Sequence, residues 1–109
     1  MNAEELKHKL REILGNQIWF NKEFDDCADL IKTAESIISW CSEVKAGKER
    51  AIRAPRADKN IVFIKKIGSS HRCIILKVVN GEFKEVHLGN HFYYDVLRKQ
   101  LGLKKDSIR

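Results

Sequence analysis

The first half of the chain carries hydrophobic residues at helical spacing. Four of them share one face between charged positions: Leu6, Leu10, Ile13 and Leu14. Steps of three and four predict a helix, and Gly15-Asn16 ends it because these residues tolerate a positive φ. Ile18-Trp19-Phe20 then reads as a short strand, since aromatic and β-branched side chains fit a pleated surface.

A longer apolar stripe predicts one long helix next in the chain. Its members recur at steps of three and four: Cys27, Leu30, Ile31, Ala34, Ile37, Ile38, Cys41 and Val44. Asp25 or Asp26 caps this helix at its start, where a carboxylate suits the helix dipole. Such a stripe is typical of a helix packed on a core, and we predict no functional site on it.

The second half contains strand patterns and a final helix. Ile61–Ile67 and His71–Val79 predict two strands, and the turn dipeptide Asn80-Gly81 joins the second to a third as a hairpin. The alternation of the third strand slips between Phe83 and Val86, which predicts a bulge. The last helix is capped by Asn90, ends before Gly102 and has four apolar members: Tyr93, Val96, Leu97 and Leu101.

This order of elements predicts an α+β fold. A small antiparallel sheet of about four strands would pack on the helices. The 109 residues suffice for a single domain, 1–109, with a helical extension at 1–15 and a frayed tail at 104–109. The stretch 45–59 lacks periodicity and is long for a connection, which is typical of functional loops.

Composition indicates a cytoplasmic protein with no membrane partner. Hydrophobic residues make up 43% and charged residues 33% of the chain, a globular balance. No apolar run approaches the ~18 residues that span a bilayer, and Met1 to Arg11 lacks a signal-peptide core. The three cysteines are odd in number and contain no C-x-x-C pair, so we predict free, structural thiols.

The positive charge is concentrated in one region of the chain. Net charge is +6, and 45–66 holds eight basic residues against Glu49 and Asp58, an excess equal to that of the whole chain. Phosphate contacts by such residues favour RNA as the partner, with a heparin-like polyanion, an acidic protein or a solvated surface as alternatives. The predicted nucleic-acid contacts of this loop are Lys48, Arg50, Arg53, Arg56 and Lys59.

Histidines and an arginine lie near neighbouring strand ends. His71-Arg72 begins the second hairpin strand, and His87 and His91 lie near the end of the third. Imidazoles move protons near neutral pH, and arginine stabilises charge on phosphorus, which suits RNA cleavage by its own 2′-hydroxyl; surface polar residues at strand ends are the alternative. We expect Tyr93 on the core side of the last helix and Tyr94 exposed, where it could stack on a base.

Other chemistries have little support. The spacing His87-x-x-x-His91 crosses a predicted strand end, so no metal site is predicted. There is no glycine-rich phosphate loop and no nucleotide-binding fingerprint, so no cofactor is predicted.

The stretch from about Ile18 to Leu101 resembles the RelE/ParE toxin superfamily. The resemblance rests on Gly68-Ser69-Ser70-His71-Arg72 leading into an apolar strand, the turn Asn80-Gly81, and a strand ending in Gly89-Asn90-His91. It implies an endoribonuclease that cleaves ribosome-bound mRNA without a metal, and a protein antitoxin as partner. The catalytic residues it implies are Arg72, His91 and, loosely, Lys65 or Lys66.

The chain also departs from the family pattern. It has an extra N-terminal helix, one long helix in place of a helical hairpin, and no match to a late tyrosine, since Leu97 falls there. Family members of the ParE type act on gyrase without being nucleases, so the fold would not settle the activity. A non-catalytic RNA- or protein-binding module therefore remains the alternative hypothesis to a toxin-type endoribonuclease.

Overall fold

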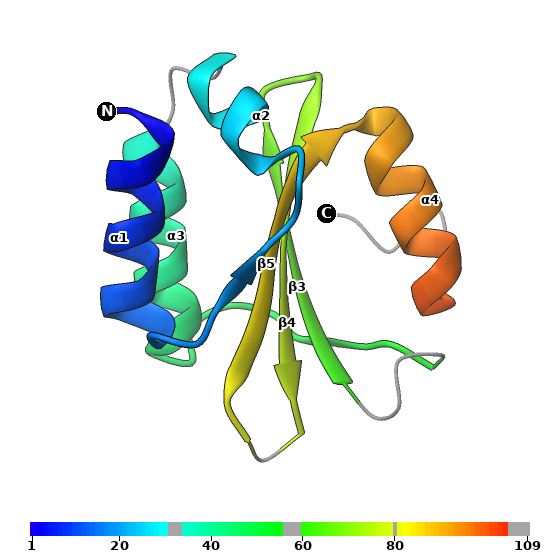
Figure 1. The fold of residues 1–109 in the computed structure, drawn as a ribbon. Helices are drawn as coiled ribbons and strands as arrows, with labels where there is room; N and C mark the ends of the chain where they lie inside the picture. The colour runs from blue at the N-terminus through cyan, green and yellow to red at the C-terminus, as the bar shows by residue number, and fades with distance from the viewer. Residues whose placement is uncertain (31–33, 56–59, 80, 105–109) are drawn as a thin grey trace.

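The protein folds as an α+β domain in which helices cover both faces of one sheet (Figure 1). The computed structural model describes residues 1–30, 34–55, 60–79 and 81–104. Its helices are α1 (Ala3–Leu14), α2 (Phe24–Leu30), α3 (Ala34–Lys45) and α4 (His91–Leu101). Its strands are β1 (Trp19–Phe20), β2 (Ile52–Arg53), β3 (Asn60–Ile67), β4 (His71–Val78) and β5 (Phe83–Asn90).

The sheet has five strands in the order β1-β5-β4-β3-β2. The central three strands form the predicted antiparallel succession, but β1 runs parallel to β5, so the sheet is mixed. The α+β class and the antiparallel central strands are confirmed, and the sheet differs from the prediction of about four antiparallel strands by one further strand and by the parallel pair of β1 and β5. The two edge strands have two residues each, and they are held by pairing with β5 and β3.

Two helices stand where one long helix was predicted. The structure describes α2 and α3 separately, and residues 31–33 between them lie outside its described part. Ala28 in α2 and Ile37 in α3 are both buried in the same core cluster. Both helices bury apolar residues in that core. The apolar stripe therefore continues through both helices and does not indicate where α2 ends and α3 begins.

The predicted first helix is confirmed as α1. Asn2 accepts a hydrogen bond from the backbone N–H of Glu5, whose side chain returns to the Asn2 N–H, so the helix starts with a capping box. Gly15 has a φ of 138°, which suits glycine at the helix end. Leu6 and Leu10 are fully buried, so α1 belongs to the main core and is no appendage.

The sheet has a different core on each face. Cys73 and Ile75 of β4 face the layer of α1, α2 and α3, whereas Ile74 and Leu76 face α4. The register between β4 and β5 jumps so that Leu76 pairs with Glu85 and Lys77 pairs with Phe83, which confirms the predicted bulge.

The ends of α4 are those the sequence predicts. The Asn90 side chain accepts the backbone N–H of Tyr93 at 2.9 Å, and Gly102 is left-handed with a φ of 77°. The predicted hairpin between β4 and β5 is present, but residue 80 of its turn and 105–109 of the predicted frayed tail lie outside the described residues.

Candidate functional site

One end of the sheet collects several residues that the sequence singled out. In the register of the central strands, Lys66 pairs with Arg72, which pairs with Gly89. His71 pairs with Asn90, and His91 follows at the start of α4. Nε2 of His91 donates to the Ser69 carbonyl at 2.7 Å, which joins α4 to the turn between β3 and β4. Antiparallel pairing therefore brings these positions to one end of the sheet, as predicted. Alternation along β4 nevertheless places His71 on the helical-layer face, with Cys73, and Arg72 on the α4 face.

Arg72 is the most buried basic group at this end. It is 6% exposed, and its Nη1 donates to the backbone carbonyl of His71 at 2.8 Å. Its Nε has no hydrogen-bond partner within the described part of the chain. No ion pair there joins a carboxylate to Arg72, Lys66 or either neighbouring histidine. A buried cation without a counter-charge is costly, so this end is suited to an anion.

Tyr94 is buried beneath α4, so the prediction of an exposed tyrosine for base stacking is wrong. Its side chain is 3% exposed, and its hydroxyl has no partner among described residues. Burial raises the pKa of Tyr94, against the opposing charges of Arg98 and Arg72. The buried face of the helix consists of Tyr94, Leu97 and Leu101, while Val96 is 42% exposed. The true face is therefore shifted by one position from the predicted one.

The predicted catalytic lysines lie on opposite faces of the sheet. Lys66 shares the face of Arg72, toward α4, whereas Lys65 pairs with Cys73 and faces the helical layer. There Lys65 lines a shallow hollow with Trp40 and Glu43 of α3. Lys65 therefore does not contribute to the site at the end of the sheet.

The basic loop and the sheet end do not form one cationic face in the described residues. Arg53 pairs with Ile61, at the far end of β3 from Lys66 and on the helical-layer face. Lys48 lies 4.0 Å from the Glu43 carboxylate, and Arg50 is exposed. The predicted contacts Arg56 and Lys59 lie outside the described residues. The case for an anion site therefore rests on the sheet end.

A hydrogen-bonded chain that the sequence analysis missed lies on the α4 face of β5. His87 is 4% exposed; its Nε2 is 2.8 Å from Oε1 of Glu85, and its Nδ1 is 2.6 Å from the Tyr93 hydroxyl. With the Nε2 proton donated to the carboxylate, Nδ1 accepts the Tyr93 O–H. Burial, with the Glu23 and Glu85 carboxylates nearby, raises the pKa of Tyr93 to about 12.

Neighbouring contacts hold this chain of groups in place. The Trp19 ring lies 5.2 Å from that of His87, and Trp19 is 52% exposed. The Asn21 amide donates to the Leu88 carbonyl and accepts its N–H, at 3.0 and 2.9 Å. The spacing of Glu85 and His87 on one strand face could have been read from the sequence. The Asn21 contact spans 67 residues, and no local signal reveals it.

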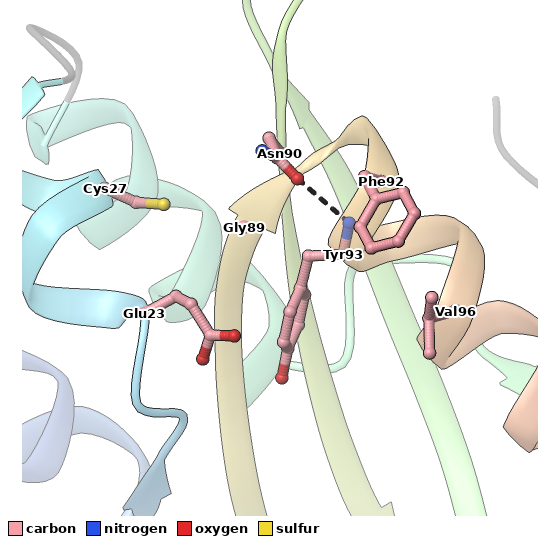
Figure 2. A pocket seen from close by; sticks show the side chains of 7 residues that line it. All are labelled: Glu23, Cys27, Gly89, Asn90, Phe92, Tyr93 and Val96. Carbon is pink, nitrogen blue, oxygen red and sulfur yellow. Dashed lines mark hydrogen bonds between the residues drawn. The ribbon is translucent and has the colours of Figure 1, made fainter.

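A pocket lies between the start of α2 and the start of α4 (Figure 2). Its volume is about 380 Å³, and seven residues line it: Glu23, Cys27, Gly89, Asn90, Phe92, Tyr93 and Val96. The Tyr93 ring packs directly on Gly89, where an added Cβ would lie 2.5 Å from Cδ1. Phe92 is 78% exposed at the rim.

The remaining features are absences within the described part of the chain. There, no group of three or more histidine, cysteine or acidic side chains is placed to hold a metal ion. No described helix is long and apolar enough to cross a membrane.

Comparisons with models of protein families, with curated proteins and with solved structures found no match to this chain.

Proposed function

We propose that the protein binds RNA at the end of β3, β4 and β5 and cleaves it as a toxin-type endoribonuclease without a metal. The observation that carries the proposal is Arg72, a buried guanidinium without a carboxylate partner in the described residues, next to Lys66. The resemblance to the RelE/ParE superfamily supports the same reading, and within it a protein antitoxin would be the partner.

His91 accepts the proton of the attacking group in this mechanism. Because Nε2 of His91 donates to Ser69, Nδ1 of the neutral ring can accept the proton of a 2′-hydroxyl. The 2′-oxygen then bonds to phosphorus, the bond to the 5′-oxygen breaks, and the leaving 5′-oxygen takes a proton from solvent water. Lys66 contacts the phosphate, and the buried charge of Arg72 adds to the attraction at low dielectric.

Lys65 and Lys66 form a matched pair of test sites because they are neighbours of equal charge on opposite faces. We expect Lys66→Ala to weaken RNA binding and to lower the salt slope of log Kd by about 1, because one phosphate contact is lost. Lys65→Ala should leave both unchanged. Titration of labelled RNA between low and high salt measures this; equal effects of the two substitutions would refute binding at this face.

Cleavage is tested separately with His91→Ala. The imidazole is exposed, and its hydrogen bond within the described residues goes to the Ser69 carbonyl, so its removal should leave the thermal midpoint nearly unchanged while transcript cleavage is lost. Arg72→Ala is a poorer test, because truncating a buried side chain also destabilises the fold. Mapped transcript ends from cells expressing each variant give the readout.

The burial of Arg72 favours the alternative of a binding module without catalysis. A guanidinium that is 6% exposed is suited to fixing the shape of the sheet end as well as to holding phosphate. RNA binding with a steep salt slope and intact transcripts would favour this second candidate.

A further inference from the structure

The pocket between α2 and α4 offers one carboxylate and an aromatic wall. Figure 2 shows the Glu23 carboxylate directed across β5 toward the Tyr93 ring, with Phe92 and Val96 beyond it on α4. Phe92 is 78% and Val96 42% exposed, which is unusual for large apolar side chains one turn apart on a helix. The volume of about 380 Å³ falls within the range of about 300–1,000 Å³ typical of ligand sites.

Glu23 is available to an incoming ligand. It is exposed, and in the described residues no lysine, arginine or histidine forms an ion pair with it. A carboxylate accepts hydrogen bonds only, so two parallel N–H donors on a flat ring are its best partner. Among the RNA bases only guanine presents two such donors side by side, from N1 and the exocyclic amine. Adenine and cytosine place an acceptor beside their amine.

The pocket is continuous with the sheet end. Gly89 and Asn90 line it, and their partners in the sheet register are Arg72 and His71. A base held in the pocket therefore brings its phosphate toward Arg72 on the neighbouring strand and Lys66 on the strand beyond it. An aromatic wall beside a basic strip is the usual arrangement for an unpaired nucleotide.

We propose that this pocket binds a guanine base of single-stranded RNA, with Glu23 reading its Watson–Crick edge and Phe92 stacking on its ring. The inference rests on the proposed RNA binding and adds the base class that the site selects. Stacking tolerates any base, whereas the carboxylate discriminates among them.

Short RNAs that differ at one base test the inference without cleavage. Pentamers with guanine, inosine or adenine at the centre, 2′-O-methylated to block attack, are titrated by fluorescence anisotropy. We expect the guanine pentamer to bind about ten-fold more tightly than the adenine one, with inosine between them because it lacks the amine.

Substitution of Glu23 gives the sharper result. Glu23→Gln presents one acceptor and one donor, which matches adenine, so the preference should move from guanine toward adenine. Glu82→Gln makes the same charge change at the opposite end of the hairpin and should keep the guanine preference. Phe92→Ala should weaken all pentamers alike. The Val96 methyl signals in an NMR spectrum should shift on adding the guanine pentamer.

The outcomes separate the two proposals. Equal affinity for all pentamers, with salt-dependent binding of longer RNA intact, overturns the guanine pocket and leaves the proposed function standing. No binding of any RNA overturns both. Val96 signals that shift with protein concentration alone would make the pocket a contact between copies of the chain and would also overturn the inference.

Discussion

At the scale of single residues, the chemistry around His87 depends on how β5 and α4 are joined. Glu85 and His87 share a strand face, and the Asn90 cap turns the chain so that Tyr93 returns to His87. Gly89 allows this return because its missing side chain leaves room for the Tyr93 ring. A short segment thus places a carboxylate, an imidazole and a phenol in contact, beside the strand that carries Arg72.

The lowered pKa of Glu85 makes the stability of the protein depend on pH. The hydrogen bond from His87 is the main cause that lowers the pKa of the Glu85 carboxyl, although partial burial opposes it. A lowered folded-state pKa stabilises the fold above the carboxyl's ordinary pKa, and this stabilisation is lost as pH falls through the folded value. We expect Glu85→Gln to destabilise the protein near pH 7 and to have little effect in strong acid.

Urea unfolding of the wild type and Glu85→Gln across this pH range measures the difference. Glu82→Gln is the control, since Glu82 is exposed and forms no ion pair in the described residues. A difference between wild type and Glu85→Gln that stays constant with pH would contradict the role of the His87 hydrogen bond.

The three cysteines should differ in reactivity. All are free thiols, as the sequence predicts. Burial raises the pKa of Cys41 to about 12 and that of Cys73 well above its ordinary value, while Cys27 is partly exposed. Because the thiolate is the reactive form, we expect a disulfide reagent to modify Cys27 in the native protein, and the other two only after unfolding. Rapid loss of all three thiols in native buffer would contradict the burial.

At the scale of elements, local signals predicted much of the fold. The N-cap residues and the C-terminal glycines of α1 and α4 could be recognised in the sequence, because the hydrogen bonds at helix ends join residues three or four positions apart. The parallel pairing of β1 was not predictable in this way, since its register to β5 joins Trp19 to Glu85. The break between α2 and α3 was hidden because both helices face one core.

In the candidate site, the pairing of the strands was predictable from the sequence, whereas the buried face of α4 was not. Antiparallel strands place the backbone of His71 beside Asn90 and so near His91, and this prediction needs only the hairpin, although the sheet face of each side chain was not considered. The face of α4 was ambiguous because both Tyr93 and Tyr94 have an apolar neighbour at Leu97, three or four residues on. Packing against the sheet buries Tyr94, and no local pattern indicates which of two adjacent tyrosines will be buried.

The first helix should be essential to the fold. Leu10 is completely buried in the core that α1 shares with α3. Leu10→Ala should lower the free energy of unfolding by about 3 kcal/mol, since it leaves a cavity. The control is Ile13→Ala, at the partly buried margin of the same helix, which should cost less. Urea denaturation measures both, and a negligible effect of Leu10→Ala would make α1 a detachable extension.

At the scale of the whole molecule, one sheet joins two cores. Ile74 and Ile75 are neighbours on β4, yet the first packs under α4 and the second under the helical layer. The α4-side core is smaller, but it shares its strands with the larger one. A substitution that destabilises the core on one face therefore also destabilises the core on the other face. We expect the two cores to unfold together.

Leu97→Ala tests this coupling from the α4 side. Leu97 is 9% exposed in the α4-side core, whereas Trp40 is buried in the core on the other face. In a Trp19→Phe background, Trp40 is the one tryptophan left to report. We expect Leu97→Ala to lower the midpoint of Trp40 fluorescence and of far-UV circular dichroism by the same amount, at a cost of about 2 kcal/mol. If helical signal were lost first while Trp40 fluorescence kept its wild-type midpoint, α4 would be a separately unfolding cover over Arg72. The phosphate site proposed at the sheet end would then open by local unfolding of α4.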